Sequence, residues 1–83
     1  MRQVSSNDFV RDFGDRVREI RLERGLSQEA LADKAGLHRT AVSFVERALR
    51  SATLETVEKL AIALEVEASD LMPKIRAKRR ASR

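Results

Sequence analysis

The fold is decided by residues 27–47, which read SQEALADKAGLHRTAVSFVER. Ser27 is a good N-cap for a short helix over residues 28–34, in which Ala30 and Leu31 form the buried pair. Gly36 ends this helix, because glycine readily takes the left-handed conformation that often follows a helix. Beyond it, apolar residues recur at spacings of three and four, which predicts a second helix. The residues expected on its buried face are Val42, Val45 and Leu49.

Only Leu37 and His38 separate the end of the first helix from the second, so the pair forms a helix-turn-helix. The outward face of the second helix carries Arg39, Thr40, Ser43, Phe44 and Arg47. A helix of this kind fits the major groove of DNA, where arginine binds guanine, threonine and serine bond either base type, and an apolar group covers a thymine methyl. The pattern therefore predicts base reading by Arg39, Thr40, Ser43 and Phe44. The alternatives are a solvated face and, for Phe44, a side pocket or a subunit interface.

A longer helix is expected before this unit, over about residues 8 to 24. The spacing of its apolar residues is helical, and they are Phe9, Phe13, Val17 and Ile20. Ser6 or Asn7 would cap it, Asp8 and Asp12 would suit its positive end, and Gly25 would follow its last turn. Gly14 either permits close packing or marks a later helix start.

After the helix-turn-helix, a fourth helix is expected to follow Thr53. Its inward residues would be Leu54, Val57, Leu60, Ala61 and Leu64. A short fifth turn near residues 68–72 would stop at Pro73. The sequence has no strand alternation and no internal repeat, so we predict an all-α, compact five-helix domain over residues 8–73, with an N-terminal segment 1–7 and a basic tail 74–83.

Charge is distributed unevenly along the 83 residues, which carry a formal net charge of +4. Six of the seventeen basic residues lie in the tail 74–83, which has no acidic residue. The first 73 residues therefore hold eleven basic and thirteen acidic side chains, a net charge of −2. The tail is expected to be disordered and either simply solvated or in contact with DNA phosphates. The basic balance of the whole chain thus reflects the tail and not the folded body.

Several classes of function are disfavoured by what the sequence lacks. It has no Cys, no Tyr and a single His, His38, which leaves no plausible nucleophile and base pair, and it shows no metal-ligand spacing and no glycine-rich phosphate loop. No apolar run is long enough for a membrane span. We therefore expect a cytoplasmic protein that is not an enzyme, with no cofactor, no metal and no membrane contact.

The residues resemble the Cro/C1-type helix-turn-helix proteins, often called the XRE family. The matching segments are FGDRVREIRLERGLSQEALA at 13–32, AGL at 35–37, RTAVS at 39–43, ER at 46–47 and LETVEKLAIAL at 54–64. The resemblance covers about residues 9 to 72. Within the family, the small size and the pattern Arg-Thr-x-x-Ser-x-x-Glu-Arg are similar to the controller proteins of restriction-modification systems.

The resemblance implies a lambda-repressor-like fold and a transcriptional regulator that binds a near-palindromic DNA operator as a homodimer. It implies phosphate contacts for Gln28, Arg21, His38, Arg47 and Arg50. Glu46 would orient Arg21 towards the DNA, although a purely structural ion pair is the alternative. The candidate dimer residues are Val66, Leu71 and Met72, with ordinary core as their alternative. Leu64 is interpreted as core.

Three positions depart from the family pattern. Glu65 follows the fourth helix where relatives usually have Gly or Asn, His38 is a poorer cap than Ser, Thr or Asp, and Phe44 is apolar where lambdoid repressors often use an amide. Further partners implied by the family are RNA polymerase or, in an alternative function, a toxin: antitoxins of some toxin-antitoxin pairs share this fold and repress their own operon. A long arm for wrapping the toxin would favour that alternative.

Overall fold

The computed structural model describes residues 4–74, with side chains described from residue 8 onward. The helices are α1 (Val4–Glu23), α2 (Gln28–Ala35), α3 (Arg39–Glu46), α4 (Leu54–Leu64) and α5 (Ala68–Leu71). All five predicted helices are present, and the all-α fold class is confirmed. Residues 75–83 of the predicted basic tail lie outside the described residues.

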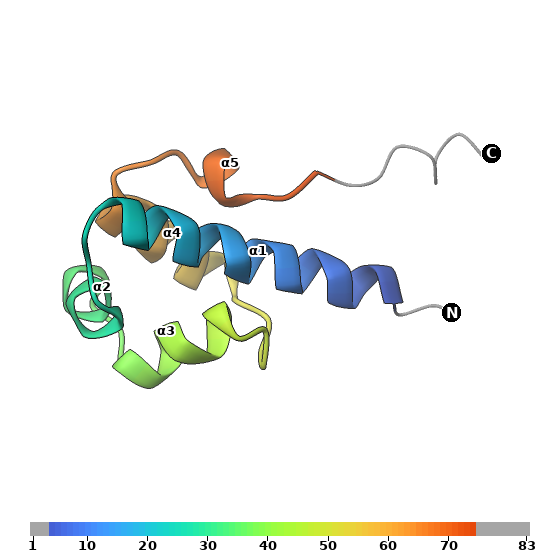
Figure 1. The fold of residues 1–83 in the computed structure, drawn as a ribbon, viewed down its shortest axis with the longest axis horizontal. Coiled ribbons are helices and arrows are strands. Elements are labelled where there is room, and N and C mark those ends of the chain that lie inside the picture. The colour runs from blue at the N-terminus through green and yellow to red at the C-terminus, as the bar shows by residue number, and fades with distance from the viewer. Residues whose placement is uncertain (1–3, 75–83) are drawn as a thin grey trace.

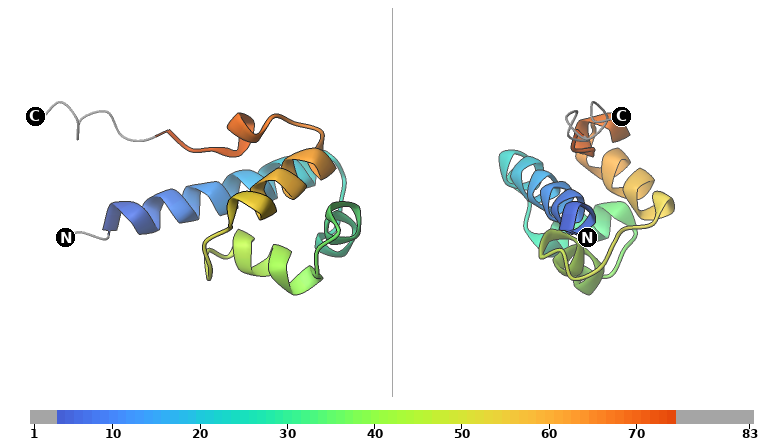
Figure 2. Two further views of the ribbon diagram at one scale, coloured as in Figure 1. Left: turned by 180° about the vertical axis from the view of Figure 1, so that it is seen from behind. Right: turned by 90° about the vertical axis from the view of Figure 1, so that its right-hand side faces the viewer.

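The helices are arranged around α1, which runs along the molecule (Figure 1). The helix α5 lies on one side of it, and α2 and α3 lie on the other (Figure 1). Seen from behind, α4 crosses next to α1, and it contacts α1, α2 and α5 (Figure 2). This packing leaves one side of α3 turned away from the rest of the protein.

The helix α1 begins at Val4, four residues earlier than the sequence predicted. Ser6 and Asn7 therefore lie inside the helix and not at its N-cap position, and the expected helix start at residue 8 is wrong. Residues 4–7 contain no Gly or Pro, and an existing helix gains one hydrogen bond for each residue that it adds. Asp8 and Asp12 consequently lie beyond the first turn, where the helix dipole acts weakly.

The ends of α2 follow the predicted capping. Ser27 Oγ accepts a hydrogen bond of 3.0 Å from the amide of Ala30, and Gly36 takes the left-handed conformation with φ of 70°. His38 caps α3, because its Nδ1 accepts a hydrogen bond of 3.1 Å from the amide of Thr40. The imidazole ring thus performs the capping role that serine or aspartate usually has.

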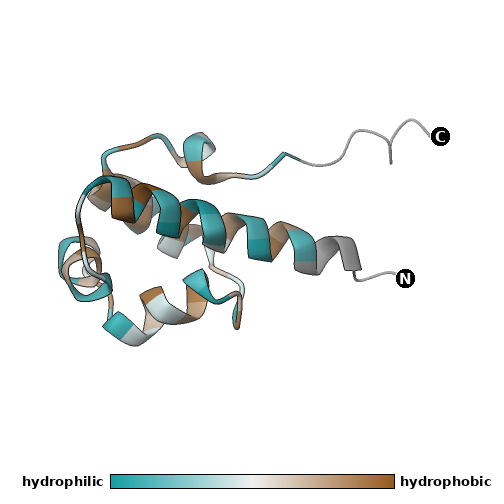
Figure 3. Ribbon diagram, viewed as in Figure 1, coloured by the Kyte–Doolittle hydropathy of each residue, from teal (hydrophilic) through white to brown (hydrophobic). Residues whose placement is uncertain are grey.

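The core is apolar and draws on all five helices. Its fully buried large side chains are Val17, Leu31, Val42, Leu60, Leu64 and Leu71. Brown and teal bands alternate along α1 in Figure 3, as expected of a helix with one apolar face. Gly14 provides close packing: a Cβ at this position would lie 2.3 Å from the carbonyl oxygen of Val45 in α3. Of the two interpretations of Gly14, close packing is therefore the correct one.

Two predicted core residues are exposed. The sequence placed Leu49 on the buried face of α3, but that helix ends at Glu46, and Ala48 turns the chain with a positive φ of 57°. Leu49 is therefore 55% exposed. Leu54 was also predicted to point inward, but it is the first residue of α4 and is 85% exposed. The helical spacing continued beyond the true end of α3 in the first case, and in the second it included the exposed first residue of α4.

The connection after α4 resolves the doubt about Glu65. This residue takes a left-handed conformation with φ of 63°, and its amide donates to the carbonyl of Ile62. The chain then enters α5, which Glu67 and Asp70 cap reciprocally. Among the described residues, no helix combines the length and the hydropathy needed to cross a lipid bilayer.

Candidate nucleic-acid interface

The outer face of α3 carries the predicted base-reading residues. Val42 and Val45 are buried, as predicted, and hold the opposite face of the helix in the core. Arg39 and Thr40 are exposed in the first turn, and within the described residues Arg39 forms no ion pair. Ser43 is half-buried one turn later. The start of α3 therefore presents a guanidinium and a hydroxyl group to solvent, which are the donors that a base edge requires.

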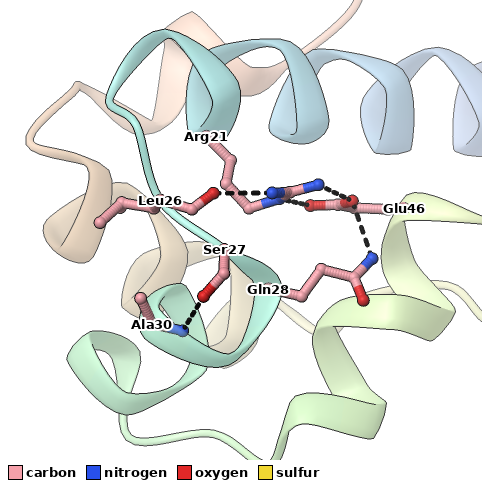
Figure 4. A network of polar contacts seen from close by, with 6 residues as sticks. All are labelled: Arg21, Leu26, Ser27, Gln28, Ala30 and Glu46. Atoms are coloured by element: carbon pink, nitrogen blue, oxygen red, sulfur yellow. Dashed lines mark hydrogen bonds and ion pairs between the residues drawn. The ribbon is translucent and has the colours of Figure 1, made fainter.

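A buried polar network joins α3 to α1 and α2 (Figure 4). Arg21 donates from Nε to Glu46 Oε2 at 2.6 Å and from Nη2 to Glu46 Oε1 at 3.0 Å. A third bond of 2.7 Å runs from Arg21 Nη1 to the carbonyl of Leu26. The side chains of Arg21 and Glu46 are only 9% and 2% exposed. Removing one partner of such a buried pair costs about 3–5 kcal/mol, because the other charge stays buried and unpaired.

This network corrects the predicted role of Arg21. A phosphate ligand needs an accessible guanidinium, but all three nitrogens of Arg21 donate to protein acceptors in a buried site. Arg21 therefore holds Glu46 in place from inside the protein. Of the two interpretations of the pair, the geometry favours the structural one.

Gln28 lies between the network and the surface. It is the first residue of α2, and its Nε2 donates a hydrogen bond of 3.1 Å to Glu46 Oε1. The side chain is half-buried, so its position is fixed by α3 as well as by its own helix. A helix N-terminus attracts anions through its amides, and Gln28 stands at the N-terminus of α2. Glu46 thus orients Gln28 as well as Arg21, a link that the sequence did not indicate.

His38 and Arg47 mark the two ends of the exposed face. Because His38 Nδ1 accepts the capping bond from Thr40, the neutral ring carries its proton on Nε2. That N–H is available to donate to an oxygen outside the protein, since the residue is exposed. Arg47 is the C-cap of α3 and is also exposed. Both residues are exposed at the ends of the face that carries the predicted base-reading residues.

Phe44 has a neighbour that the sequence did not reveal. The guanidinium carbon of Arg50 lies 5.2 Å from the centre of the Phe44 ring, within the range of a cation–π interaction. The two residues are six positions apart, and helical spacing would not pair them. They meet because α3 ends at Glu46 and the chain turns back at Ala48. The ring of Phe44 therefore packs against the guanidinium of Arg50.

The predicted dimer residues divide into two groups. Leu71 is completely buried in the core of the single chain, so it cannot contribute to a subunit contact and that prediction is wrong. Val66 is half-buried and Met72 is 37% exposed. Ile62 on α4 is 69% exposed and was missed, because it lies off the core stripe. The apolar surface of the α4 and α5 region therefore includes Ile62, Val66 and Met72.

The known proteins that this chain resembles are helix-turn-helix, control and regulatory proteins. A family model described as helix-turn-helix matches residues 17–71. The control protein C.BamHI from Bacillus amyloliquefaciens is 46% identical over 61 residues, which are 72% of this chain and 75% of that protein. The crystal structure of the restriction-modification controller protein C.AhdI from Aeromonas hydrophila aligns with a TM-score of 0.74 and 48% identity, over 78% of this chain and 97% of that one. The crystal structure of the master regulator for biofilm formation, SinR, in complex with DNA aligns with a TM-score of 0.68 and 33% identity, over 71% and 95% of the two chains.

Proposed function

Because the chain belongs to the helix-turn-helix family of DNA-binding transcriptional regulators, we propose that it acts as a homodimer on a near-palindromic double-stranded operator. The observation that carries the proposal is the outer face of α3, where Arg39 and Thr40 are exposed in the first turn while Val42 and Val45 anchor the opposite face. One short helix reads only a few base pairs. A two-fold dimer doubles the site, with half-sites about one helical turn apart.

Base reading is assigned to the first turns of α3. Arg39 would bind the O6 and N7 atoms of a guanine, and Thr40 and Ser43 would bond neighbouring base edges. Phe44 would contact a thymine methyl with the part of its ring that Arg50 leaves uncovered. These side chains are close together on a rigid helix, which supports reading of one short half-site.

Backbone contacts are assigned to residues around that helix. Gln28 at the start of α2, His38 at the start of α3, and Arg47 and Arg50 at its far end would bind phosphates. Such contacts fix the register of the protein on the duplex but carry no sequence information. Glu46 and Arg21 would position Gln28 from within the protein, as the two hydrogen bonds from Arg21 to Glu46 and the one from Gln28 to Glu46 support.

Dimerisation is assigned to the exposed apolar residues of α4 and α5. Ile62, Val66 and Met72 could be buried in a symmetric contact, which is the commonest form of a soluble oligomer. The likeness to C.BamHI and C.AhdI supports a narrower role as the controller of a restriction-modification operon, in the cytoplasm. We infer that it regulates its own promoter, by blocking RNA polymerase or by recruiting it.

The test begins with footprinting on the DNA immediately upstream of the protein's own gene. Protection of two half-sites about one turn apart is expected. Arg39→Ala should then weaken binding to this site by about 1–3 kcal/mol while leaving binding to unrelated DNA nearly unchanged. Arg47→Ala is the matched control, since a lost phosphate contact weakens binding to both sequences equally. An equal loss on both sequences for Arg39→Ala would remove it from the base-reading set.

A further inference from the structure

A cleft opens between the N-terminal half of α1 and the loop that follows α3. It is lined by Val10, Arg11, Ala48, Leu49, Arg50 and Ser51, and its volume is about 390 Å³. In Figure 1 the loop lies beneath α1, near the end of α3. A water needs about 10–15 Å³ of such cavity volume, so the cleft has room for a tetrahedral anion and its solvent. Two of the six lining residues are arginines and none is a carboxylate, which favours an anionic ligand.

The α1 side of the cleft contributes Arg11. Its Nη1 donates a hydrogen bond of 3.1 Å to Asp8, one turn earlier in the helix. The two side chains are 62% and 45% exposed, and an ion pair this open to water is weak. The bond uses one of the five N–H groups of the guanidinium. An anion in the cleft can therefore compete with Asp8 for Arg11.

The loop side contributes Arg50, which the structure ties to α3. Its guanidinium lies over the ring of Phe44, so it stays next to the proposed base-reading helix. Ser51 adds a hydroxyl that can donate to the same anion. The left-handed turn at Ala48 brings this short segment back towards Val10 and Arg11. Two positive groups from distant parts of the chain thus border one cleft beside α3.

We propose that this cleft binds a phosphate of the DNA backbone, held between Arg11 and Arg50, next to the bases that α3 reads. The inference rests on the proposed function, because α3 in the major groove brings the following loop to the flanking strand. It adds Arg11 of α1 to the proposed DNA-binding surface. The only phosphate contact that the sequence predicted on that helix was Arg21, which is buried. Free inorganic phosphate has the same chemistry, so the test must separate the two sources.

The test measures how the affinity for DNA depends on salt concentration. Each phosphate that a protein neutralises contributes about 0.9 to the slope of log affinity against log salt. Arg11→Gln should lower the magnitude of this slope by about 1, equally on the operator and on an unrelated duplex. Lys59→Gln is the matched control: it removes the same charge from α4, where Lys59 pairs with Glu55 on an exposed face away from the cleft. Its slope should stay at the wild-type value.

A second variant predicts an effect of the opposite sign. Asp8→Asn removes the carboxylate that competes for Arg11, so DNA binding should strengthen by about 1.4- to 5-fold, the range expected for an exposed ion pair. Glu58→Gln on α4 makes the same chemical change at an exposed position outside the cleft and should have a smaller effect. A purely structural role for the pair would instead make Asp8→Asn neutral or harmful.

The outcomes separate the cleft from the wider function. A slope for Arg11→Gln equal to that of Lys59→Gln would overturn the proposal. A second result would also overturn it. In that result, inorganic phosphate shifts the nuclear magnetic resonance signals of Arg11 and Arg50, but Arg11→Gln leaves the salt slope of DNA binding unchanged. A reduced slope on the unrelated duplex, in a protein without sequence preference, would support the cleft and contradict the proposed function. Sequence preference with an unchanged slope would contradict the cleft alone.

Discussion

Four helix ends in this protein have the same geometry but not the same residue. After α1, α2, α3 and α4 the chain turns through a left-handed residue, with φ of 73° at Gly25, 70° at Gly36, 57° at Ala48 and 63° at Glu65. At each end the left-handed residue donates to the carbonyl three positions earlier, and the next residue donates to the carbonyl five positions earlier. The backbone thus satisfies its last carbonyls in the same way with and without glycine.

The difference lies in where these ends are found. The glycine ends, Gly25 and Gly36, frame α2 and hold the helix-turn-helix in register. The other two, Ala48 and Glu65, lead into the loop of the phosphate cleft and into the apolar surface of α4 and α5. A left-handed residue other than glycine costs about 1–2 kcal/mol, and such strain tends to occur at functional sites. The two strained helix ends therefore lie next to the two proposed contact surfaces.

Among the glycine positions, the largest effect is expected at Gly14, which ends no helix. Gly14→Ala would place its methyl 2.3 Å from the backbone oxygen of Val45, so α1 and α3 must separate. Overpacking of this kind costs about 1–3 kcal/mol, and contact with rigid backbone puts Gly14→Ala near the upper value. Urea unfolding followed by circular dichroism measures the change. An unchanged midpoint would mean that the two helices are less closely packed than the structure indicates.

A smaller loss is expected at Gly36, where space is not the constraint. A Cβ there meets nothing within 4 Å, so Gly36→Ala tests only the left-handed backbone. The free energy of unfolding should fall by about 1–2 kcal/mol, and Gly25→Ala, in equally open space, should match it. If Gly36→Ala lowered the free energy of unfolding far more than Gly25→Ala, the turn at Gly36 would depend on more than its φ angle.

The sequence could predict the left-handed helix ends at glycine, but not those at Ala48 and Glu65. Gly25 and Gly36 carry a local signal, since glycine favours a positive φ wherever it stands. Ala48 carries none, and the apolar spacing from Val42 to Leu49 suggested that α3 continued, although the chain turns at Ala48. The contact of Arg50 with Phe44 was unpredictable for the same reason, because it depends on that turn.

The positions of the predicted site residues in the fold could be predicted to a similar extent. The outward position of Arg39 and Thr40 follows from helical spacing alone, which is a local property. The burial of Arg21 and of Leu71 depends on how α1, α3 and α5 meet, and spacing cannot distinguish a residue in the core from one at its edge. The family resemblance pairs Arg21 with Glu46 but does not indicate that water is excluded from the pair.

The smallest effects are gains at the ends without glycine. Glu65→Gly should raise the free energy of unfolding by about 0.5–1 kcal/mol, because relief of the left-handed strain exceeds the added flexibility of the unfolded chain. Glu65→Ala keeps the Cβ and removes the charge, so it should give little change and serves as the control. Ala48→Gly should give a similar gain in stability, since the turn keeps the same hydrogen bonds. Thermal unfolding detects both gains, as 1 kcal/mol shifts the midpoint by about 4–8 °C in a domain of this size. A gain in stability at Ala48 accompanied by a lower salt slope would show that the strained end itself holds the cleft in shape, and that the absence of glycine there serves binding.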